Sequence, residues 1–269
     1  MEFPIVLQDV SVRYRLPKER IRSVKEYVIK SFRGRIEYEE FWALQNITFQ
    51  VPPGEMLGII GRNGAGKSTL LKLIARVMKP ISGTIRVSGK VAPMIELGGG
   101  FDHELSGREN VYLFGSILGI NRREMEKKFD AIVEFAELED FMEAPLRAYS
   151  SGMIMRLGFA MVIAVDPEIM ILDEILAVGD TAFQEKCQAH IARFRQAGGT
   201  ILLVSHSLDQ IRQFCDRALW LEHGEMRDWG NTEVVVHHYT KYLESIVSHK
   251  SRPEERAGLM RNFNTGRGF

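Results

Sequence analysis

Cysteine is scarce in this chain, which has only Cys187 and Cys215 among its 269 residues. Two cysteines so far apart supply neither a disulfide framework nor the closely spaced ligands of a structural zinc site. Free thiols of this kind are usually buried, and they are typical of proteins from reducing compartments. We therefore expect two buried thiols and no covalent cross-link.

The sequence also lacks a long apolar run and an excess of charge of one sign. No stretch of about 18 apolar residues is present, so no bilayer-spanning helix is predicted. The amino-terminal MEFPIVLQDV has neither the basic lead nor the apolar core of a signal peptide. With 35 Lys+Arg against 35 Asp+Glu the net charge is +0, so we expect no nucleic acid partner.

The basic residues are nevertheless concentrated near the amino terminus. Residues 13–36 hold nine basic and two acidic side chains. Within them Val24, Tyr27, Val28 and Phe32 recur at helical spacing, which predicts a short amphipathic helix. Two interpretations stay open: a solvated charged face, or a face turned toward a membrane surface or a partner.

Predicted strands and helices alternate along most of the chain, which favours a parallel β-sheet. Residues 98–150 interrupt this alternation, and helical stretches at about 107–118 and 122–137 predict a helical insertion. We interpret 82–97 as a hairpin and 232–248 as a helix. The segments that we predict as the main strands are 5–15, 43–51, 56–60, 169–173, 200–205 and 217–222.

The segment GRNGAGKS at 61–68 has the G-x-x-x-x-G-K-S pattern of a phosphate-binding loop. It follows an apolar strand and precedes a helix, which is the context that the motif requires. Glycines let the backbone wrap around phosphate oxygens, and the helix N-terminus attracts the anion. Lys67 is expected to reach the β- and γ-phosphates and Ser68 to bind Mg²⁺. The predicted nucleotide contacts are Gly61, Arg62, Asn63, Gly64, Ala65, Gly66, Lys67, Ser68 and Thr69.

Polar residues end two other buried strands. IMILDE at 169–174 closes with Asp173, placed to hold Mg²⁺ through water, and Glu174, placed to polarise an attacking water. TILLVSH at 200–206 closes with His206. Ligands bind at the carboxyl ends of strands in such sheets, so we expect the three strand ends to form one site, with His206 donating to the γ-phosphate. The second carboxylate favours hydrolysis; an ordinary acidic turn is the alternative.

The order of these motifs, with YSSGM at 149–153 and LAVGD at 176–180, resembles the ATPase subunits of ATP-binding cassette (ABC) transporters over roughly residues 4–230. The resemblance implies an α/β P-loop NTPase core with a parallel sheet, an antiparallel β subdomain and an inserted helical subdomain. It also implies ATP and Mg²⁺ as cofactors. The expected ATPase domain is 1–245, with a helical subdomain at about 97–162, an N-terminal insertion at about 18–38 and a tail at 246–269.

The turn at 149–153 stands where the ABC family has its LSGGQ signature. The resemblance implies that Ser150, Ser151 and Gly152 cap the γ-phosphate held by a second copy, so that two ATPs lie between two subunits. Donors at a helix N-terminus suit this task. A plain serine N-cap of a core helix is the alternative. Ser151 and Met153 depart from the family sequence, and we assign Met153 no polar contact.

Other family positions transfer less directly. Asp180 matches the family's D-loop, which communicates across the dimer, and could equally cap the next helix. The adenine-stacking aromatic is Tyr14 as first choice and Trp42 as second. Glu96 lies near the position of the family's Q-loop glutamine and could touch Mg²⁺ or water. The glycines at 98–100 suggest a hinge.

Several segments resemble the branch of the family that exports cell-surface polysaccharides such as O-antigen, teichoic acid or capsule; they are ELGGGFDHELSGREN, YSSGM, DEILAVGD and VSHSLDQIRQFCDRALWL. The resemblance implies a homodimer that works with two copies of an integral membrane permease on a lipid-linked glycan, at the cytoplasmic face of the cell membrane. The helix at 23–32 would lie near the membrane. An importer or small-molecule exporter subunit is the alternative.

Overall fold

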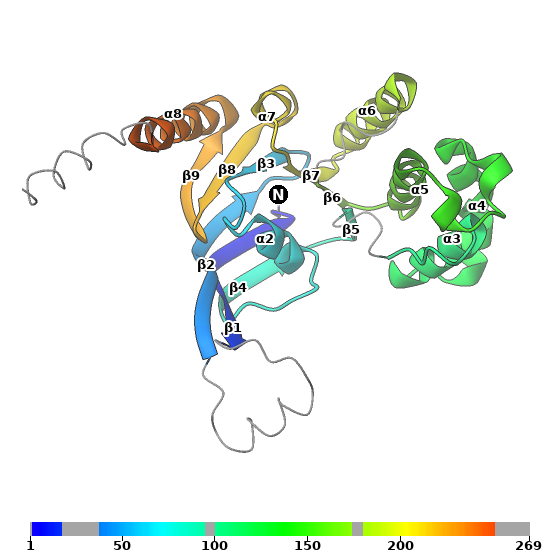
Figure 1. Cartoon of the computed structure of the whole chain (residues 1–269), viewed down its shortest axis with the longest axis horizontal. Coiled ribbons are helices and arrows are strands. Elements are labelled where there is room, and N and C mark those ends of the chain that lie inside the picture. The colour runs from blue at the N-terminus through cyan, green and yellow to red at the C-terminus, as the bar shows by residue number, and fades with distance from the viewer. Residues whose placement is uncertain (1, 18–37, 95–99, 174–179, 251–269) are drawn as a thin grey trace, which may run out of the picture.

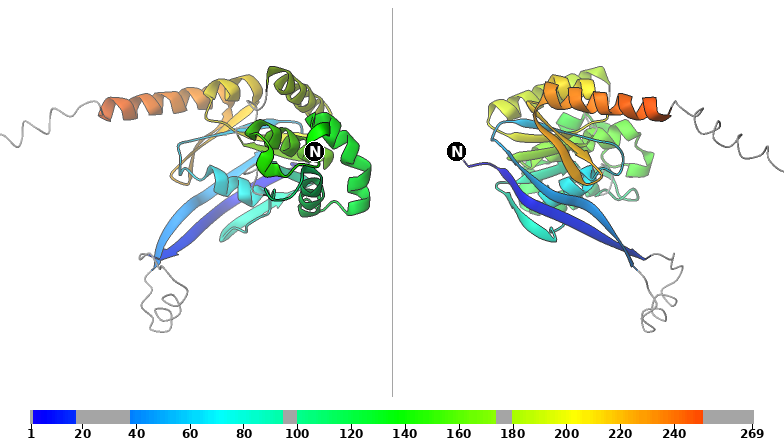
Figure 2. Two further views of the ribbon diagram at one scale, coloured as in Figure 1. Left: turned by 45° about the vertical axis from the view of Figure 1, so that its right-hand side comes forward. Right: turned by 90° about the vertical axis from the view of Figure 1, so that its left-hand side faces the viewer.

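The computed structural model describes residues 2–17, 38–94, 100–173 and 180–250. Two β-sheets lie together at the centre of the molecule, and a group of helices lies to one side of them (Figure 1). Two long strands of the smaller sheet project away from the rest of the molecule, as the turned views in Figure 2 show. The parallel core, antiparallel subdomain and helical subdomain that the sequence predicts are confirmed.

The smaller sheet is antiparallel and has the strand order β2-β1-β4. Its strands are β1 (Ile5–Pro17), β2 (Tyr38–Val51) and β4 (Ser82–Val87). Apolar side chains of β1 and β2 alternate inward and are buried. The register shifts near Asp9 and Asn46, which both have a φ of 50°. Bulges of this kind bend the strand that carries them and increase its local twist.

The hairpin predicted for 82–97 is wrong. β4 pairs with β1, with Leu7 opposite Ile85, whereas β5 (Val91–Met94) joins the larger sheet in parallel with β6. Ile85 and Val87 of β4 pack against the buried core that β1 and β2 share, whereas β5 contributes Val91 to that core and Ala92 to a second core. The local pattern predicted two strands correctly but could not identify their partners.

The larger sheet has the order β5-β6-β7-β3-β8-β9 and is parallel except at its last strand. The central strands β3 and β7 are buried at every residue because helices or the smaller sheet cover both faces. β8 and β9 form an antiparallel hairpin around His223 and Gly224. The remaining bounds are β3 (Met56–Ile60), β6 (Ile169–Asp173), β7 (Thr200–Val204), β8 (Arg217–Glu222) and β9 (Glu225–Asn231).

The helices divide into two groups. The inserted group has its own buried core and comprises α3 (Gly107–Ile117), α4 (Arg122–Ala136), α5 (Ser151–Ala164) and the 3₁₀ turns η1 (Glu139–Phe141) and η2 (Leu146–Ala148). The others pack on the sheets: α2 (Lys67–Ile74), α6 (Thr181–Gln196), α7 (Leu208–Phe214) and α8 (Thr232–Lys250). α8 continues through residue 245, where the sequence suggested a domain end.

Both cysteines are buried free thiols, as predicted. Cys187 lies on α6, and Cys215 follows α7 beneath β3. Burial raises the pKa of each thiol to about 12. None of the helices within the described ranges combines the length and hydropathy that a bilayer crossing requires.

Candidate functional site

The loop at 61–66 joins β3 to α2, and two of its glycines are fixed by close backbone contacts. A Cβ on Gly61, where φ is 148°, would lie 2.2 Å from the Leu221 carbonyl oxygen. A Cβ on Gly66, where φ is 107°, would lie 2.5 Å from the Ala43 carbonyl oxygen. Only glycine therefore fits at these two positions.

Gly64 is needed for a different reason. Its φ is 80°, yet a Cβ there would meet no atom within 4 Å. The residue is therefore fixed by its backbone conformation while its outer side stays open. This open side is where a phosphate can approach the loop.

The N-terminus of α2 is suited to an anion. Gly66 caps the helix without a side-chain hydrogen bond, and the first turn has no acidic residue. The backbone N–H groups of the first turn and the positive end of the helix dipole therefore point toward the loop. The Lys67 ammonium donates to the carbonyl oxygens of Gly61 at 2.7 Å and Arg62 at 3.1 Å, which holds a positive charge over the loop.

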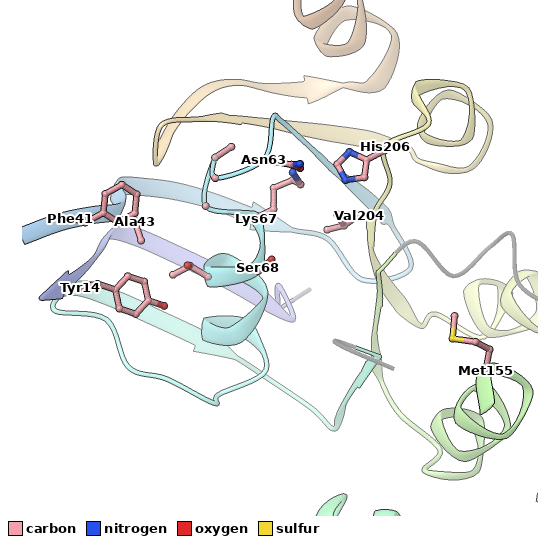
Figure 3. A pocket seen from close by; sticks show the side chains of 13 residues that line it. Tyr14, Phe41, Ala43, Asn63, Lys67, Ser68, Met155, Val204 and His206 are labelled. Atoms are coloured by element: carbon pink, nitrogen blue, oxygen red, sulfur yellow. The ribbon is translucent and has the colours of Figure 1, made fainter. Parts of the chain in front are cut away.

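Three neighbouring parallel strands end at this loop. β7 lies between β6 and β3, and Val204 pairs with both Asp173 and Ile59. The residues that follow these positions therefore emerge at one edge of the sheet, as expected. A cavity of about 760 Å³ lies there, within the usual range of small-molecule and cofactor sites. Its wall comprises Tyr14, Phe41, Ala43, Asn63, Gly64, Ala65, Gly66, Lys67, Ser68, Thr69, Met155, Val204 and His206 (Figure 3).

His206 is held by a short, internally bonded turn. The buried Ser205 hydroxyl donates to the Gln210 side-chain oxygen at 2.7 Å and accepts from the Ser207 amide at 3.0 Å. Ser207 in turn caps α7. These bonds fix the backbone on both sides of His206, whose ring faces the cavity (Figure 3).

Tyr14 and Trp42 are the two residues that the sequence offers for stacking on adenine. The structure places Tyr14 in the cavity wall and Trp42 outside it. Trp42 lies under the Arg13 guanidinium, whose carbon is 5.3 Å from the ring centroid. Phe41 lies in the wall instead, directly opposite Tyr14 on the neighbouring strand. Sequence reasoning missed Phe41, although strand alternation places it on the same face as Ala43.

The signature turn does not line this cavity: among the described residues of α5, only Met155 does. Ser150 caps α5 by accepting from the Met153 amide at 3.2 Å, so the plain capping role is real. Below it, the buried Tyr149 hydroxyl donates to the Phe141 carbonyl oxygen at 2.7 Å. Ser150 and Ser151 themselves are exposed.

Gly152 has no structural requirement within its own chain. Its φ is not positive, and a Cβ there would meet only the Ser150 hydroxyl oxygen, at 3.7 Å. Gly107 in the same subdomain is the opposite case, because its Cβ would lie 2.2 Å from the Tyr149 hydroxyl. The position that a Cβ of Gly152 would occupy is therefore open space on the outside of this chain.

Asp180 caps α6, accepting from the Phe183 amide at 2.9 Å, and pairs with Arg156 of α5. The hydrogen bond from Phe183 and the nearby Arg156 charge lower the pKa of Asp180. The cap that the sequence offered as one role for Asp180 is thus confirmed.

Several predicted residues lie outside the described ranges: Glu96, Glu174, the helix at 23–32 and the first two glycines of 98–100. Asp173 ends β6, and only its backbone is described. Gly100 packs closely, since its Cβ would lie 2.5 Å from the Phe114 ring. In the part of the chain that the structure covers, no cluster of three or more His, Cys, Asp or Glu side chains forms a separate metal site.

Comparison with known proteins identifies the family. The ABC transporter family model matches residues 44–177. An O-antigen export system ATP-binding protein, RfbB of Klebsiella pneumoniae, is 43% identical over 90% of this chain and 100% of its own length. The teichoic acids export ATP-binding protein TagH of Bacillus anthracis is 37% identical, over 99% of this chain and 50% of its own length. The solved dimer of the ATP-binding cassette MJ0796, bound to ADP and Pi, has a TM-score of 0.67 and 22% identity, covering 85% of this chain and 98% of that one.

Proposed function

The chain belongs to the ABC transporter family of ATP-binding proteins, and we propose that it is the ATP-hydrolysing subunit of an exporter of lipid-linked cell-surface polysaccharide. The observation that carries the proposal is the match to RfbB, which is covered from end to end. Relatives named for teichoic acid export support the same class of substrate. We retain the residue ranges of the expected ATPase domain, helical subdomain and insertion as part of the proposal.

ATP fits the cavity at the strand ends. The open side of Gly64 and the uncapped N-terminus of α2 receive the phosphates, and Lys67 adds a positive charge beside them. The adenine ring lies at the end of the cavity away from the phosphates, against Tyr14 and Phe41. The remaining residues of 61–69 supply backbone and side-chain contacts to the phosphates.

Mg²⁺ fits the oxygen donors around the same phosphates. The Ser68 hydroxyl lies in the cavity wall, and Asp173 ends the adjacent strand β6. We assign Ser68, Asp173 and Glu96 to the ion, which neutralises phosphate charge when bound. Glu174 withdraws a proton from the attacking water, and His206 donates to the γ-phosphate.

The second half of the site comes from another copy of the chain. In the proposal, Ser150, Ser151 and Gly152 of one copy close over the ATP of the other, and Asp180 lies at the same interface. The outward, unhindered side of Gly152 supports this arrangement, because a glycine without a role in its own fold suits close approach by another molecule. ATP then favours the closed homodimer, and hydrolysis reopens it.

Two copies of an integral membrane permease complete the transporter, and the ATPase binds them at the cytoplasmic face of the membrane. The lipid-linked glycan crosses through the permease. The basic residues of the segment 18–38 suit anionic head groups or a pyrophosphate-linked substrate, so we place this segment near the membrane.

The test is reconstitution of the chain with its permease in liposomes. Lipid-linked glycan should raise ATP hydrolysis several-fold over vesicles that hold the same lipid carrier without sugar. The Lys67→Ala variant supplies the baseline. Stimulation by a water-soluble nutrient or an amphiphilic drug, with none by the glycan lipid, would show that the transporter belongs to another branch.

A further inference from the structure

We propose that Arg156 is a positioning residue that holds the signature turn and Asp180 in one fixed arrangement, so that a second copy meets both as a single surface. This inference rests on the proposed function, because it concerns the ATP-dependent pairing of two copies. Arg156 itself touches neither nucleotide nor partner in this account.

Arg156 joins three helices. Its side chain is only 17% exposed. One guanidinium nitrogen, Nη1, donates to Glu137 Oε2 at 2.9 Å, and the other, Nη2, pairs with Asp180 Oδ2. The guanidinium carbon lies 4.8 Å from the centroid of the Phe183 ring. Arg156 on α5 is thus fixed to the end of α4 and to the start of α6.

Glu137 supports a second link to α6. The Lys186 ammonium donates to Glu137 Oε1 at 3.1 Å and to the Phe135 carbonyl oxygen at 2.9 Å. Glu137 ends α4 with a φ of 57°, a conformation that glycine adopts more easily. A charged residue in this place lets one carboxylate hold cations from α5 and α6 together.

Helix geometry connects this cluster to the signature turn. Arg156 lies four residues after Gly152 on α5, so the two share one face of the helix, one turn apart. Asp180 caps the N-terminus of α6, which is the next helix after β6 and the predicted general base Glu174. A shift of the signature turn relative to Asp180 would therefore break the Arg156 contacts.

Only arginine suits this position. Its planar fork reaches two carboxylates in different directions while its flat face packs on Phe183. Lysine carries one compact charge and could satisfy one carboxylate at a time. The Arg156→Lys variant therefore separates the requirement for charge from the requirement for a rigid bridge.

The experiment uses the full chain in the Glu174→Gln background and measures ATP-dependent dimerisation by analytical ultracentrifugation. Arg156→Lys and Arg156→Gln should weaken the dimer by roughly tenfold, the effect of losing a charged hydrogen bond. ATP affinity at low protein concentration should stay within about twofold, since no P-loop contact changes. The melting temperature is recorded for each variant, so that dimer formation is compared at equal folded fraction.

Arg108→Lys is the matched control. Arg108 lies in the same subdomain, pairs with Glu143 at 2.7 Å and packs over the Phe129 ring at 4.4 Å, but it contacts neither α5 nor α6 in these interactions. Its replacement should leave dimerisation unchanged. An equal loss in the Arg108 and Arg156 variants would reduce Arg156 to a general stabilising role and overturn the inference.

A double-mutant cycle tests the route. Asp180→Asn keeps an oxygen for the Phe183 amide but removes the charge that Arg156 binds. The double variant with Arg156→Gln should dimerise no worse than the poorer single variant. Additive losses would disprove coupling through this pair. If the Glu174→Gln chain itself fails to dimerise with ATP, the proposed function fails, whatever Arg156 does.

Discussion

Tyr14 and Phe41 are direct cross-strand neighbours of β1 and β2, and both lie in the wall of the P-loop cavity. They are 37% and 50% exposed, so each keeps a free ring surface beside the cavity. Trp42, the next residue along β2, points to the other side of the sheet and packs against Arg13. The proposed adenine subsite therefore offers two aromatic rings from two strands.

Replacing either ring should weaken ATP binding. Tyr14→Ala and Phe41→Ala should each lower the affinity by about fivefold or more, since one stacked base is worth roughly 1–3 kcal/mol. Trp42→Ala is the matched control and should change the affinity by less than about twofold. Titration with a fluorescent ATP analogue measures all three. A larger loss for Trp42 than for Phe41 would reverse the assignment of the two residues.

Glu174→Gln should bind ATP normally but hydrolyse it at least about 100-fold more slowly, because the amide cannot accept the proton of the attacking water. The variant should then accumulate as a stable ATP-bound dimer. Phosphate release and size-exclusion chromatography measure the two effects. Normal turnover by this variant would refute the assignment of Glu174 as the general base. Chelation of Mg²⁺ should stop hydrolysis in the unmodified chain.

Ser150→Arg should leave ATP binding to the isolated chain intact and abolish ATP-driven dimerisation, since the long cation would occupy space that the partner copy needs. The assay pairs equilibrium binding at low protein concentration with ultracentrifugation at high concentration. Loss of binding in the isolated chain would contradict a role for the turn in the partner's site.

Gly152→Ala and Gly107→Ala should behave in opposite ways. The Gly152 substitution meets no close contact in its own chain, so the melting temperature should hold while dimerisation falls. The Gly107 substitution clashes with the Tyr149 hydroxyl and should destabilise the fold by about 1–3 kcal/mol. Thermal unfolding of both variants decides this. A clear loss of stability in Gly152→Ala would indicate a purely internal role.

Removal of the segment 18–37 should leave the flanking strands β1 and β2 paired. Pro17 pairs with Tyr38, so an Asn-Gly turn in place of 18–37 should close the β1–β2 hairpin. ATP hydrolysis by the isolated chain should remain, and glycan export should be lost. Unaffected export in cells would refute a role for this segment at the membrane.

The two buried cysteines should make the free energy of unfolding fall as the pH becomes alkaline. Burial raises both thiol pKa values from 9.0 to about 12, so the thiols stay neutral in the folded chain at neutral pH. The stability that the folded chain gains from these two neutral thiols is fully present below pH 9.0 and is lost as the pH rises toward 12. Cys215→Ala should flatten this fall in denaturant titrations. Rapid alkylation of both native thiols at neutral pH would contradict their burial.

Local sequence signals predicted the parts of the site that depend on residue type and spacing. Three glycines, a lysine and a serine between an apolar strand and a helix specify the P-loop, because each residue meets a nearby backbone requirement. Asp173 and His206 were found because parallel strands must end at one edge of a sheet. The capping of α5 and α6 by Ser150 and Asp180 is likewise a short-range interaction.

Contacts between segments distant in the sequence were decided by tertiary packing alone. β4 and β5 have similar local patterns yet join different sheets, because β4 pairs with β1 and β5 pairs with β6, both distant in the sequence. Phe41 lines the cavity because strand register sets it opposite Tyr14, and Arg156 meets Glu137 and Asp180 because three helices converge. Amino-acid order encodes the chemistry of each group, whereas long-range burial of apolar surface determines which groups meet.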